Sequence, residues 1–301
     1  MLRRMKYHLA PNICKIAPKA NMVNLYFLYL YIRSKAFKLT IGSYIGGSSQ
    51  PTIPMKTLRI LEIPYPKIDI QNKIVQIAYS IDEKIRVNTL VNKNLEAQAR
   101  TIYRDMFGDT NVDFKVGQLS DIADITMGQS PKGDTYNETG EGTIFYQGRA
   151  EFGFRFPTQR LFTTEPKRMA QENDVLMSVR APVGDINIAH EICCIGRGLA
   201  AIRSKCGCQS FILYTMYSLR EQIDIFNGEG TVFGSINRAG LNSLSVQIPS
   251  QEKIRRFEEL VEPMDNAIRK YHDENIQLTA IRDTLIPRLM SGEIDVSSIE
   301  I

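Results

Sequence analysis

The fold of this chain is decided by a short pattern that occurs twice, as Ile63-Pro64 with Gln71-Asn-Lys-Ile74 and as Ile248-Pro249 with Gln251-Glu-Lys-Ile254. In each copy an apolar segment ends in Ile-Pro, and a Gln-x-Lys-Ile sequence then begins a helical pattern. The first copy has five more residues between the proline and the glutamine. Self-similarity at a fixed spacing indicates a repeated structural unit. Each copy is therefore expected to mark the place where a mixed module passes into a helix.

The repeat extends in both directions from this pattern. Downstream, residues match at a spacing of 183 positions: Ile85-Arg86 with Ile268-Arg269, Asn92 with Asn275, Leu95 with Leu278, and Ala97 with Ala280. Upstream, about 185 positions separate Ile16 from Ile202 and Leu28-Tyr29 from Leu213-Tyr214. Residues 109 to about 198 have no counterpart before residue 12. The sequence therefore predicts one and a half copies of a unit, in which the first module is shortened at its N-terminal side.

Long helices are predicted over residues 71–107 and 251–291, because apolar residues recur there at steps of three and four. The repeat favours pairing of the two helices with each other over packing of each on its own module. Asn92 and Asn275 occupy equivalent places near the middle of each helix. In an antiparallel pair, equivalent positions meet only near the midpoint, so an Asn–Asn layer there would fix the register.

The remainder of the chain has mixed character. Strands are predicted at Thr143–Gln147, Asp174–Val179 and Asp185–Ala189, and a helix is predicted at Phe211–Ile225. The predicted fold class is α+β, with mixed α/β modules joined by two long helices that form an antiparallel coiled coil. The predicted organisation is the C-terminal part of a first module (1–66), a first long helix (67–108), a complete module (109–250), and a second long helix with a tail (251–301).

The amino-acid composition is compatible with several classes of protein and excludes few of them. The hydrophobic content of 43% and the charged content of 23% are ordinary for a globular protein. The net charge of +4 is uneven, with +11 in residues 1–108, −3 in residues 109–250 and −4 in residues 251–301. A basic first third suits a polyanionic partner. The apolar run Met22–Ile32 is about half of the ~20 residues needed to cross a bilayer, so a buried helix is expected. The five cysteines have no disulfide-framework spacing and no signal peptide precedes them, so a cytoplasmic protein is expected.

Three further segments occur in a specific order. They are Leu119-x-Asp121-Ile122-Ala123-x-Ile125-Thr126-x-Gly128-x-Ser130-Pro131, then Asp174-Val-Leu-Met-Ser-Val-Arg180-Ala-Pro182-Val-Gly184 with Ile195-Gly196-Arg-Gly198, and finally Arg282-Asp-Thr-Leu-Ile-Pro-Arg-Leu-Met-Ser-Gly-Glu-Ile294. The first two resemble the opening and the middle of a type I target-recognition domain, and the third resembles the terminal helix of the same family. With the repeat, nearly the whole chain resembles the specificity subunit of a type I restriction–modification system.

This resemblance implies a protein that recognises a DNA sequence and does no chemistry itself. Such subunits have two target-recognition domains, separated by two long helices, and each domain reads one half of a split target in double-stranded DNA. The helices dock methyltransferase subunits, which bind S-adenosylmethionine and methylate adenine, and a motor–nuclease subunit cleaves. No cofactor, metal or membrane contact is then expected on this chain, because S-adenosylmethionine, Mg²⁺ and ATP belong to the partner subunits. The shortened first domain departs from the family, and two half-length chains could restore two domains as a homodimer.

The sequence contains no enzymatic motif. It has no phosphate-binding loop, and Gly228-Glu-Gly230-Thr-Val-Phe-Gly234 has one residue too many for a dinucleotide fingerprint. It also has no Asn/Asp-Pro-Pro-aromatic segment of the kind that an amino-methyltransferase places around its target base. Cys193-Cys194 and Cys206-x-Cys208 do not have zinc-ligand spacing. The chain is therefore predicted not to be an enzyme, and any methylation is assigned to a partner.

Polar and basic residues in the turns of the complete module are the candidates for contact with DNA. These candidates are Gln129, Lys132, Arg149, Arg155, Arg160, Lys167, Arg168, Arg180 and Thr231. Arginine bidentate to guanine and glutamine bidentate to adenine are the usual base contacts in the major groove. The lysines, Arg168 and Arg180 suit phosphate contacts, and Thr231 lies on a Gly-rich loop that could approach a nucleic-acid backbone closely.

Two other functions remain open at this point. A truncated or half-length chain could act only as a dimerising scaffold or a recombination partner. Alternatively, the chain could be a stand-alone DNA-binding protein outside restriction. Adjacent methyltransferase and motor–nuclease genes would support restriction over both.

Overall fold

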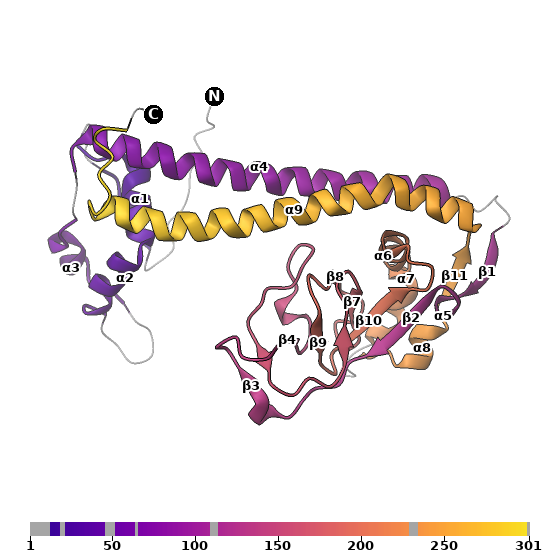
Figure 1. Cartoon of the computed structure of the whole chain (residues 1–301). Coiled ribbons are helices and arrows are strands. Elements are labelled where there is room, and N and C mark those ends of the chain that lie inside the picture. The colour runs from indigo at the N-terminus through magenta and orange to yellow at the C-terminus, as the bar shows by residue number, and fades with distance from the viewer. Residues whose placement is uncertain are drawn as a thin grey trace. The chain divides into compact units, whose positions relative to one another are not determined.

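The computed structural model describes residues 13–18, 22–45, 52–63, 66–108, 114–228 and 234–299 (Figure 1). The chain forms two compact units, of which the first comprises residues 1–92 and 269–301 and the second comprises residues 93–268. Each unit includes about half of each long helix, so the division between the units falls within the helices. Among the described residues, no helix is long and apolar enough to cross a bilayer.

The helices follow the repeat that the sequence predicts. The long helices α4 (Ile68–Phe107) and α9 (Gln251–Met290) have forty residues each, and their first residues lie 183 positions apart. Shorter helices precede both: α1 (Leu25–Arg33), α2 (Lys35–Gly42) and α3 (Met55–Ile60) before α4, and α6 (Gln209–Ser218), α7 (Arg220–Asp224) and α8 (Arg238–Asn242) before α9. The first residues of these pairs are 183 to 185 positions apart.

The core of the first unit lies between α1, the beginning of α4 and the end of α9. Its buried side chains are Phe27, Tyr31, Ile74, Ala78, Ile286, Leu289, Met290 and Val296. Asn24 caps α1, because its side-chain oxygen accepts from the backbone N–H of Tyr26 at 2.9 Å. The Asn24 N–H in turn donates to Oε1 of Gln71 at 2.8 Å. Gln71 of the repeated motif is fully buried and thereby ties the start of α1 to α4.

The predicted burial of Met22–Ile32 holds for one side of α1 only. Phe27 and Tyr31 face the core, whereas Leu25 and Tyr29 are exposed. The segment is therefore an amphipathic helix on the surface of the first unit rather than a fully buried one.

Side chains of α4 and α9 meet in antiparallel order within each unit. In the first unit, Asp82 of α4 accepts a hydrogen bond from Arg282 of α9 at 2.8 Å. In the second unit, the rings of Tyr103 and Phe257 lie 5.6 Å apart between their centroids. Later residues of α4 thus meet earlier residues of α9, which is the antiparallel arrangement that the sequence predicts.

An asparagine layer is present, one turn away from the expected place. Nδ2 of Asn88 donates to Oδ1 of Asn275 at 3.0 Å and to a carboxylate oxygen of Glu274 at 2.8 Å. Asn275 therefore meets Asn88, and Asn92 lies one turn further along α4, where it is buried. The role of Asn92 in the register stays a prediction.

The described residues of the second unit form three sheets. In one, β1 (Lys115–Gln118) pairs with β11 (Ser245–Ile248). The order in the second is β2 (Ala123–Met127), β10 (Leu199–Ser204), β7 (Val175–Ser178) and β8 (Ile186–Ile188), and α5 (Leu119–Ile122) leads into β2. The order in the third is β3 (Tyr136–Asn137), β5 (Phe162–Thr163), β4 (Thr143–Tyr146), β9 (Cys193–Ile195) and β6 (Met169–Ala170). Pairing is antiparallel except between β4 and β9.

The predicted strands and helix of this module are confirmed. Thr143–Gln147, Asp174–Val179 and Asp185–Ala189 contain β4, β7 and β8, and Phe211–Ile225 overlaps α6 and α7. Helix α6 packs on β10 and β7. Aromatic side chains of α4, α6 and α9 then join in one core, as the ring contacts of Phe107, Phe211 and Phe257 show. Burial of each such ring contributes about 1.5–3 kcal/mol, so the sheet is held firmly on the helices.

Candidate nucleic-acid interface

Several loops of the second unit meet at the end of β9. The N–H of Gln129 donates to the carbonyl oxygen of Ile195 at 2.9 Å. The N–H of Ile195 donates to the carbonyl oxygen of Arg168, also at 2.9 Å. Gly196 donates to the carbonyl oxygen of Tyr146 at 2.8 Å. We call residues 128–130, 146–148, 168, 178–180 and 195–198 the loop cluster.

The 178–180 segment joins the loop cluster through Gly198. The carbonyl oxygen of Gly198 accepts a hydrogen bond from the N–H of Val179 at 2.9 Å, and the N–H of Gly198 donates to the carbonyl oxygen of Gln147 at 3.3 Å. Ser130 adds a side-chain contact, since its Oγ accepts from the N–H of Arg197 at 3.2 Å. Segments far apart in the sequence are thus fixed to one another by backbone hydrogen bonds.

Three glycines permit this close approach of backbones. A Cβ atom on Gly128 would lie 2.1 Å from the carbonyl oxygen of Gly196. Cβ atoms on Gly196 and Gly198 would lie 2.8 and 2.9 Å from the carbonyl oxygen of Gln147. No side chain fits at these separations. Glycine is therefore needed at these positions of the two sequence motifs, because the loops pack closely against each other.

The loop cluster brings together three of the predicted DNA-contacting residues. Gln129, Arg168 and Arg180 are all exposed there. Two residues that were not predicted join them, because Gln147 and Arg197 are exposed in the same cluster. The position of Arg197 between Gly196 and Gly198 is the sequence signal that could have identified it.

The cluster is chemically suited to base recognition. Guanidinium groups can donate two hydrogen bonds to guanine, and carboxamides can both donate to and accept from adenine. Backbones that are fixed by hydrogen bonds hold such groups in place, so less conformational freedom is lost on binding.

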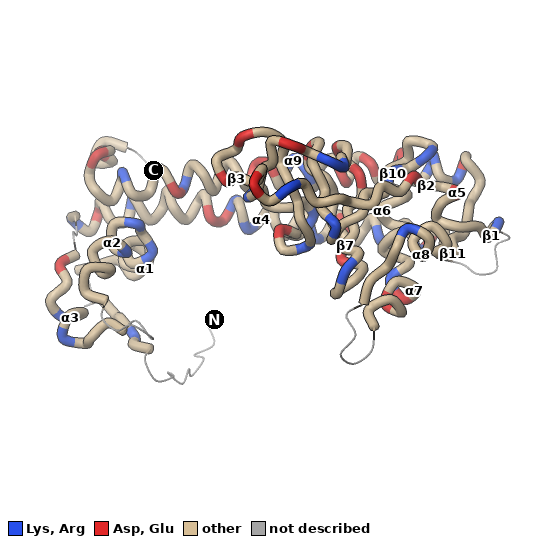
Figure 2. The backbone as a smooth tube through the Cα atoms, turned by 90° about the horizontal axis from the view of Figure 1, so that it is seen from below, with Lys and Arg blue, Asp and Glu red and all other residues tan. Residues whose placement is uncertain are grey.

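Two other predicted arginines have acidic partners. Arg149 forms an ion pair with Asp185. Arg160 pairs with Glu151 at 2.6 Å and with Glu138 at 3.2 Å. The hydrogen bond to Glu151 raises the pKa of Arg160 above its ordinary value. Figure 2 likewise shows acidic positions beside basic ones along the tube. For either arginine, contact with a phosphate would require exchange of a carboxylate partner.

The remaining surface candidates lie near the cluster in sequence. Lys132 is exposed just before the short 3₁₀ turn Gly133–Thr135, and Lys167 is exposed beside Arg168. Both are accessible to a phosphate. Thr231 lies outside the described residues.

Arg155 is not a DNA-contacting residue, and that prediction is wrong. Its side chain is 1% exposed. It forms ion pairs with Asp265 of α9 and, at 3.3 Å, with Glu96 of α4, and it donates to the hydroxyl of Tyr214 at 3.1 Å. Burial, the largest influence, opposes its charge, but the pKa is raised because the carboxylate of Asp265 together with Tyr214 and Tyr217 outweighs that penalty. Arg155 therefore positions the strand module on the helices instead of facing DNA.

Known proteins resemble this chain over most of its length. The family model described as "Type I restriction modification DNA specificity domain" matches residues 1–97 and 111–280. A Methanocaldococcus jannaschii protein named as the MjaX specificity subunit of a type I restriction enzyme is 30% identical, over 95% of this chain and 72% of its own length. The HindI specificity subunit of Haemophilus influenzae is 21% identical, over 96% of this chain and 81% of its own length.

A solved structure shares the fold. The S subunit of a type I restriction–modification system from M. genitalium aligns with a TM-score of 0.60 at 19% sequence identity, over 90% of this chain and 74% of that chain. This similarity shows that the two chains share a fold.

Proposed function

From the premise that this chain belongs to the type I restriction–modification DNA specificity family, we propose that the loop cluster of its second unit reads the DNA sequence. The chain is a specificity subunit, which recognises DNA within a restriction–modification system. Family membership does not favour a stand-alone DNA-binding protein outside restriction.

One observation supports the loop cluster above other surfaces of the second unit. Exposed Gln129, Gln147, Arg168, Arg180 and Arg197 are held on backbones that hydrogen bonds and close glycine contacts fix together. These residue types are the ones that discriminate bases, and a good bidentate contact contributes about 1–3 kcal/mol of discrimination.

Phosphate contacts would orient the module on the duplex. Lys132 and Lys167 are exposed and lie next to segments of the cluster in sequence. Phosphate contacts by lysine carry no sequence information, but they make binding depend on salt. The basic first third of the chain, with a net charge of +11 in residues 1–108, would add to this electrostatic attraction.

The chemistry is proposed to belong to partner subunits. The family is generally non-catalytic, and the residues described in the loop cluster are recognition groups. We therefore place adenine methylation with S-adenosylmethionine on methyltransferase subunits, and ATP-driven cleavage with Mg²⁺ on a motor–nuclease subunit. Helices α4 and α9 are the proposed docking elements for the methyltransferase. A cytoplasmic location is proposed, since that is where such a complex meets DNA.

DNA binding by purified chain in complex with its methyltransferase subunit tests this function. Arg197→Ala should weaken binding to the cognate sequence about 5- to 150-fold, while binding to unrelated DNA changes little. Lys205→Ala is the matched control, because Lys205 is exposed just beyond the opposite end of β10 from the cluster. Equal losses on cognate and unrelated DNA for Arg197→Ala would contradict base reading by the loop cluster. Failure of the chain to co-purify with any methyltransferase subunit would contradict its place in the complex.

A further inference from the structure

Two cysteines of the second unit lie in the turn between β10 and α6. Cys206 is exposed, whereas Cys208 is only 8% exposed. Gly207 alone separates them, and its φ of +81° lies in the left-handed region that favours glycine. The Sγ atom of Cys208 lies 3.9 Å from the carbonyl oxygen of Cys206, and a hydrogen bond joins the two thiols. The chain therefore turns at Gly207 and brings the two sulfur atoms together.

Side-chain hydrogen bonds hold both ends of this turn in place. Nε2 of Gln209 donates to the carbonyl oxygen of Ile202 at 3.0 Å, and Oε1 of Gln209 accepts from the N–H of Ser204 at 2.9 Å. At the start of α6, the carboxylate of Glu258 accepts from the N–H of Ser210 at 2.9 Å. The turn is thus fixed to the end of β10 and to the start of α6, so the two thiols are held near each other before any reaction.

The hydroxyl group of Ser204 is directed at the sulfur of Cys206. Oγ of Ser204 accepts from the N–H of Cys206 at 3.3 Å and from the N–H of Cys208 at 3.1 Å. A hydroxyl has two acceptor lone pairs and one hydrogen. These two bonds therefore leave the hydrogen of Ser204 to Sγ of Cys206, which lies 3.3 Å away. A hydrogen bond donated to the sulfur favours the thiolate, which is the nucleophilic form of cysteine.

The two thiols differ in how readily they ionise. Burial opposes the charge of Cys206, but hydrogen bonds from the Ser204 hydroxyl and from Cys208 lower the pKa of Cys206 below its ordinary value. At Cys208 burial is again the largest cause, and the hydrogen bond and the charge of Cys206 add to it, so the pKa of Cys208 is raised. Cys206 is thus the accessible nucleophile, and Cys208 is a covered, protonated neighbour.

We propose that Cys206 and Cys208 form a reversible disulfide by exchange with a low-molecular-weight disulfide. In the first step, the thiolate of Cys206 attacks one sulfur of the small disulfide, whose S–S bond breaks, and one small thiolate leaves. In the second step, the sulfur of Cys208 attacks that of Cys206 and releases the second small thiolate, which takes the proton of Cys208. Two cysteine side chains are oxidised, and one small disulfide is reduced to two thiols.

The first step prepares the second. The mixed disulfide carries no charge on Cys206, so one of the causes that keep Cys208 protonated is removed. Cys208 then ionises more readily, and it needs no access from solvent because the sulfur that it attacks lies beside it. The site is a modification site of the second unit and does not depend on base reading by the loop cluster.

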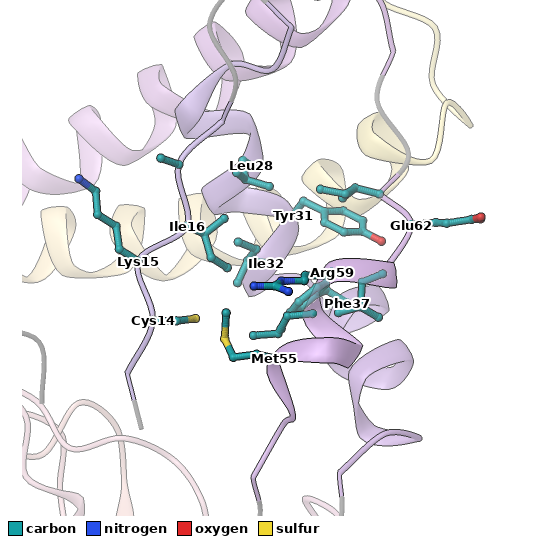
Figure 3. Close-up of a pocket in the computed structure, with 14 residues that line it drawn as sticks. Cys14, Lys15, Ile16, Leu28, Tyr31, Ile32, Phe37, Met55, Arg59 and Glu62 are labelled. Carbon is teal, nitrogen blue, oxygen red and sulfur yellow. The ribbon is translucent and has the colours of Figure 1, made fainter. Parts of the chain in front are cut away.

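Cys14 offers a comparison within the same chain. Figure 3 shows it among the residues that line a pocket of about 300 Å³ in the first unit. Cys14 is exposed, and the described residues that line this pocket include no second cysteine. A thiol without a neighbouring thiol cannot release the small molecule that it has bound. Exchange at Cys14 should therefore stop at the mixed disulfide.

Mass spectrometry of the full chain after treatment with oxidised glutathione tests the proposal. Trypsin cuts after Lys205 and Arg220, so both cysteines lie on the peptide 206–220. Without reduction, this peptide should be lighter by two hydrogen atoms and carry no glutathione, whereas the peptide with Cys14 should carry glutathione. Cys208→Ser should leave glutathione on Cys206, and dithiothreitol should reverse each change. An unaltered peptide 206–220 in the unsubstituted chain, or one that keeps glutathione, overturns the proposal.

The rate of the first step tests the part that Ser204 plays. The Cys208→Ser chain isolates this step, because its reaction ends with glutathione on Cys206. Adding Ser204→Ala removes the hydroxyl that donates to Cys206, so glutathione should add at least ~3-fold more slowly at neutral pH, since less thiolate is present. Adding Ser243→Ala instead removes an exposed hydroxyl just after α8, and the rate should not change. Equal rates for the two serine variants overturn the activation of Cys206 by Ser204.

Discussion

Arg155 and Asp265 form an ion pair in the interior of the second unit, where the side chain of Arg155 is 1% exposed. Arg155 comes from the strand module and Asp265 from α9, so the pair joins the module to the long helix. Glu96 of α4 lies 3.3 Å from the same guanidinium group. One buried arginine thus connects the recognition module with both helices.

Removal of one partner of this pair should be costly. Asp265→Asn leaves the buried Arg155 charge poorly compensated, and a loss of about 3–5 kcal/mol in the free energy of unfolding is expected. The double variant Arg155→Met with Asp265→Asn should lose less than the sum of the single changes Arg155→Met and Asp265→Asn, because the two charges are removed together. Urea unfolding of all three variants measures the coupling. Additive effects would contradict the structure of this pair.

An exposed pair offers the matched control. Arg149 and Asp185 form an ion pair near the surface of the same unit, with half-exposed side chains. Arg149→Ala should change the free energy of unfolding by less than about 1 kcal/mol. If Arg149→Ala lowered the free energy of unfolding as much as Asp265→Asn, burial would not be what makes the Arg155–Asp265 pair contribute more to stability than the exposed pair.

The glycine contacts of the loop cluster predict a second effect on stability. Gly196→Ala places a Cβ atom 2.8 Å from the carbonyl oxygen of Gln147. We expect a loss of about 1–3 kcal/mol and a displaced loop. Gly133→Ala is the control, since its Cβ would meet nothing within 4 Å. Thermal unfolding of both variants checks this, and a neutral Gly196→Ala would mean that the loops are not packed as described.

The asparagine layer between the helices gives a third prediction. Asn88→Leu leaves the carboxamide of Asn275 and the carboxylate of Glu274 without the hydrogen bonds that Asn88 donates, so a loss of about 1–3 kcal/mol is expected. The double change Asn88→Leu with Asn275→Leu should recover part of that loss, because an apolar layer replaces the polar one. Urea unfolding of the single and double variants distinguishes this layer from two independent surface residues, for which the losses would simply add.

The sequence alone predicted the features that depend on periodicity. The limits of α4 and α9 follow from their apolar stripes, and the spacing of 183 residues between Ile68 and Gln251 reproduces the repeat. Strands β4, β7 and β8 follow from local patterns in the same way. These signals are local, and for the two long helices the repeat provides the signal twice.

The features that the sequence did not predict depend on distant partners. Arg155 stands in a run of aromatic residues and looks like a surface arginine, but its partners Glu96 and Asp265 are 59 and 110 positions away. Its burial is therefore visible only in the fold. The asparagine contact shows the same limit, because a shift of one turn along α4 brings Asn88 rather than Asn92 to Asn275. The exposed Arg197 is the opposite case, since it was not predicted although its flanking glycines are a local signal of close backbone contact.

Methylome sequencing of a host strain that carries the methyltransferase partner, with and without this chain, tests most directly whether the protein selects the DNA sequence. One adenine-containing motif should be methylated only when the chain is present. Arg197→Ala should relax or abolish methylation of that motif, while Lys205→Ala should leave it unchanged. A methylated motif that is the same with and without the chain would contradict the claim that this protein selects the DNA sequence.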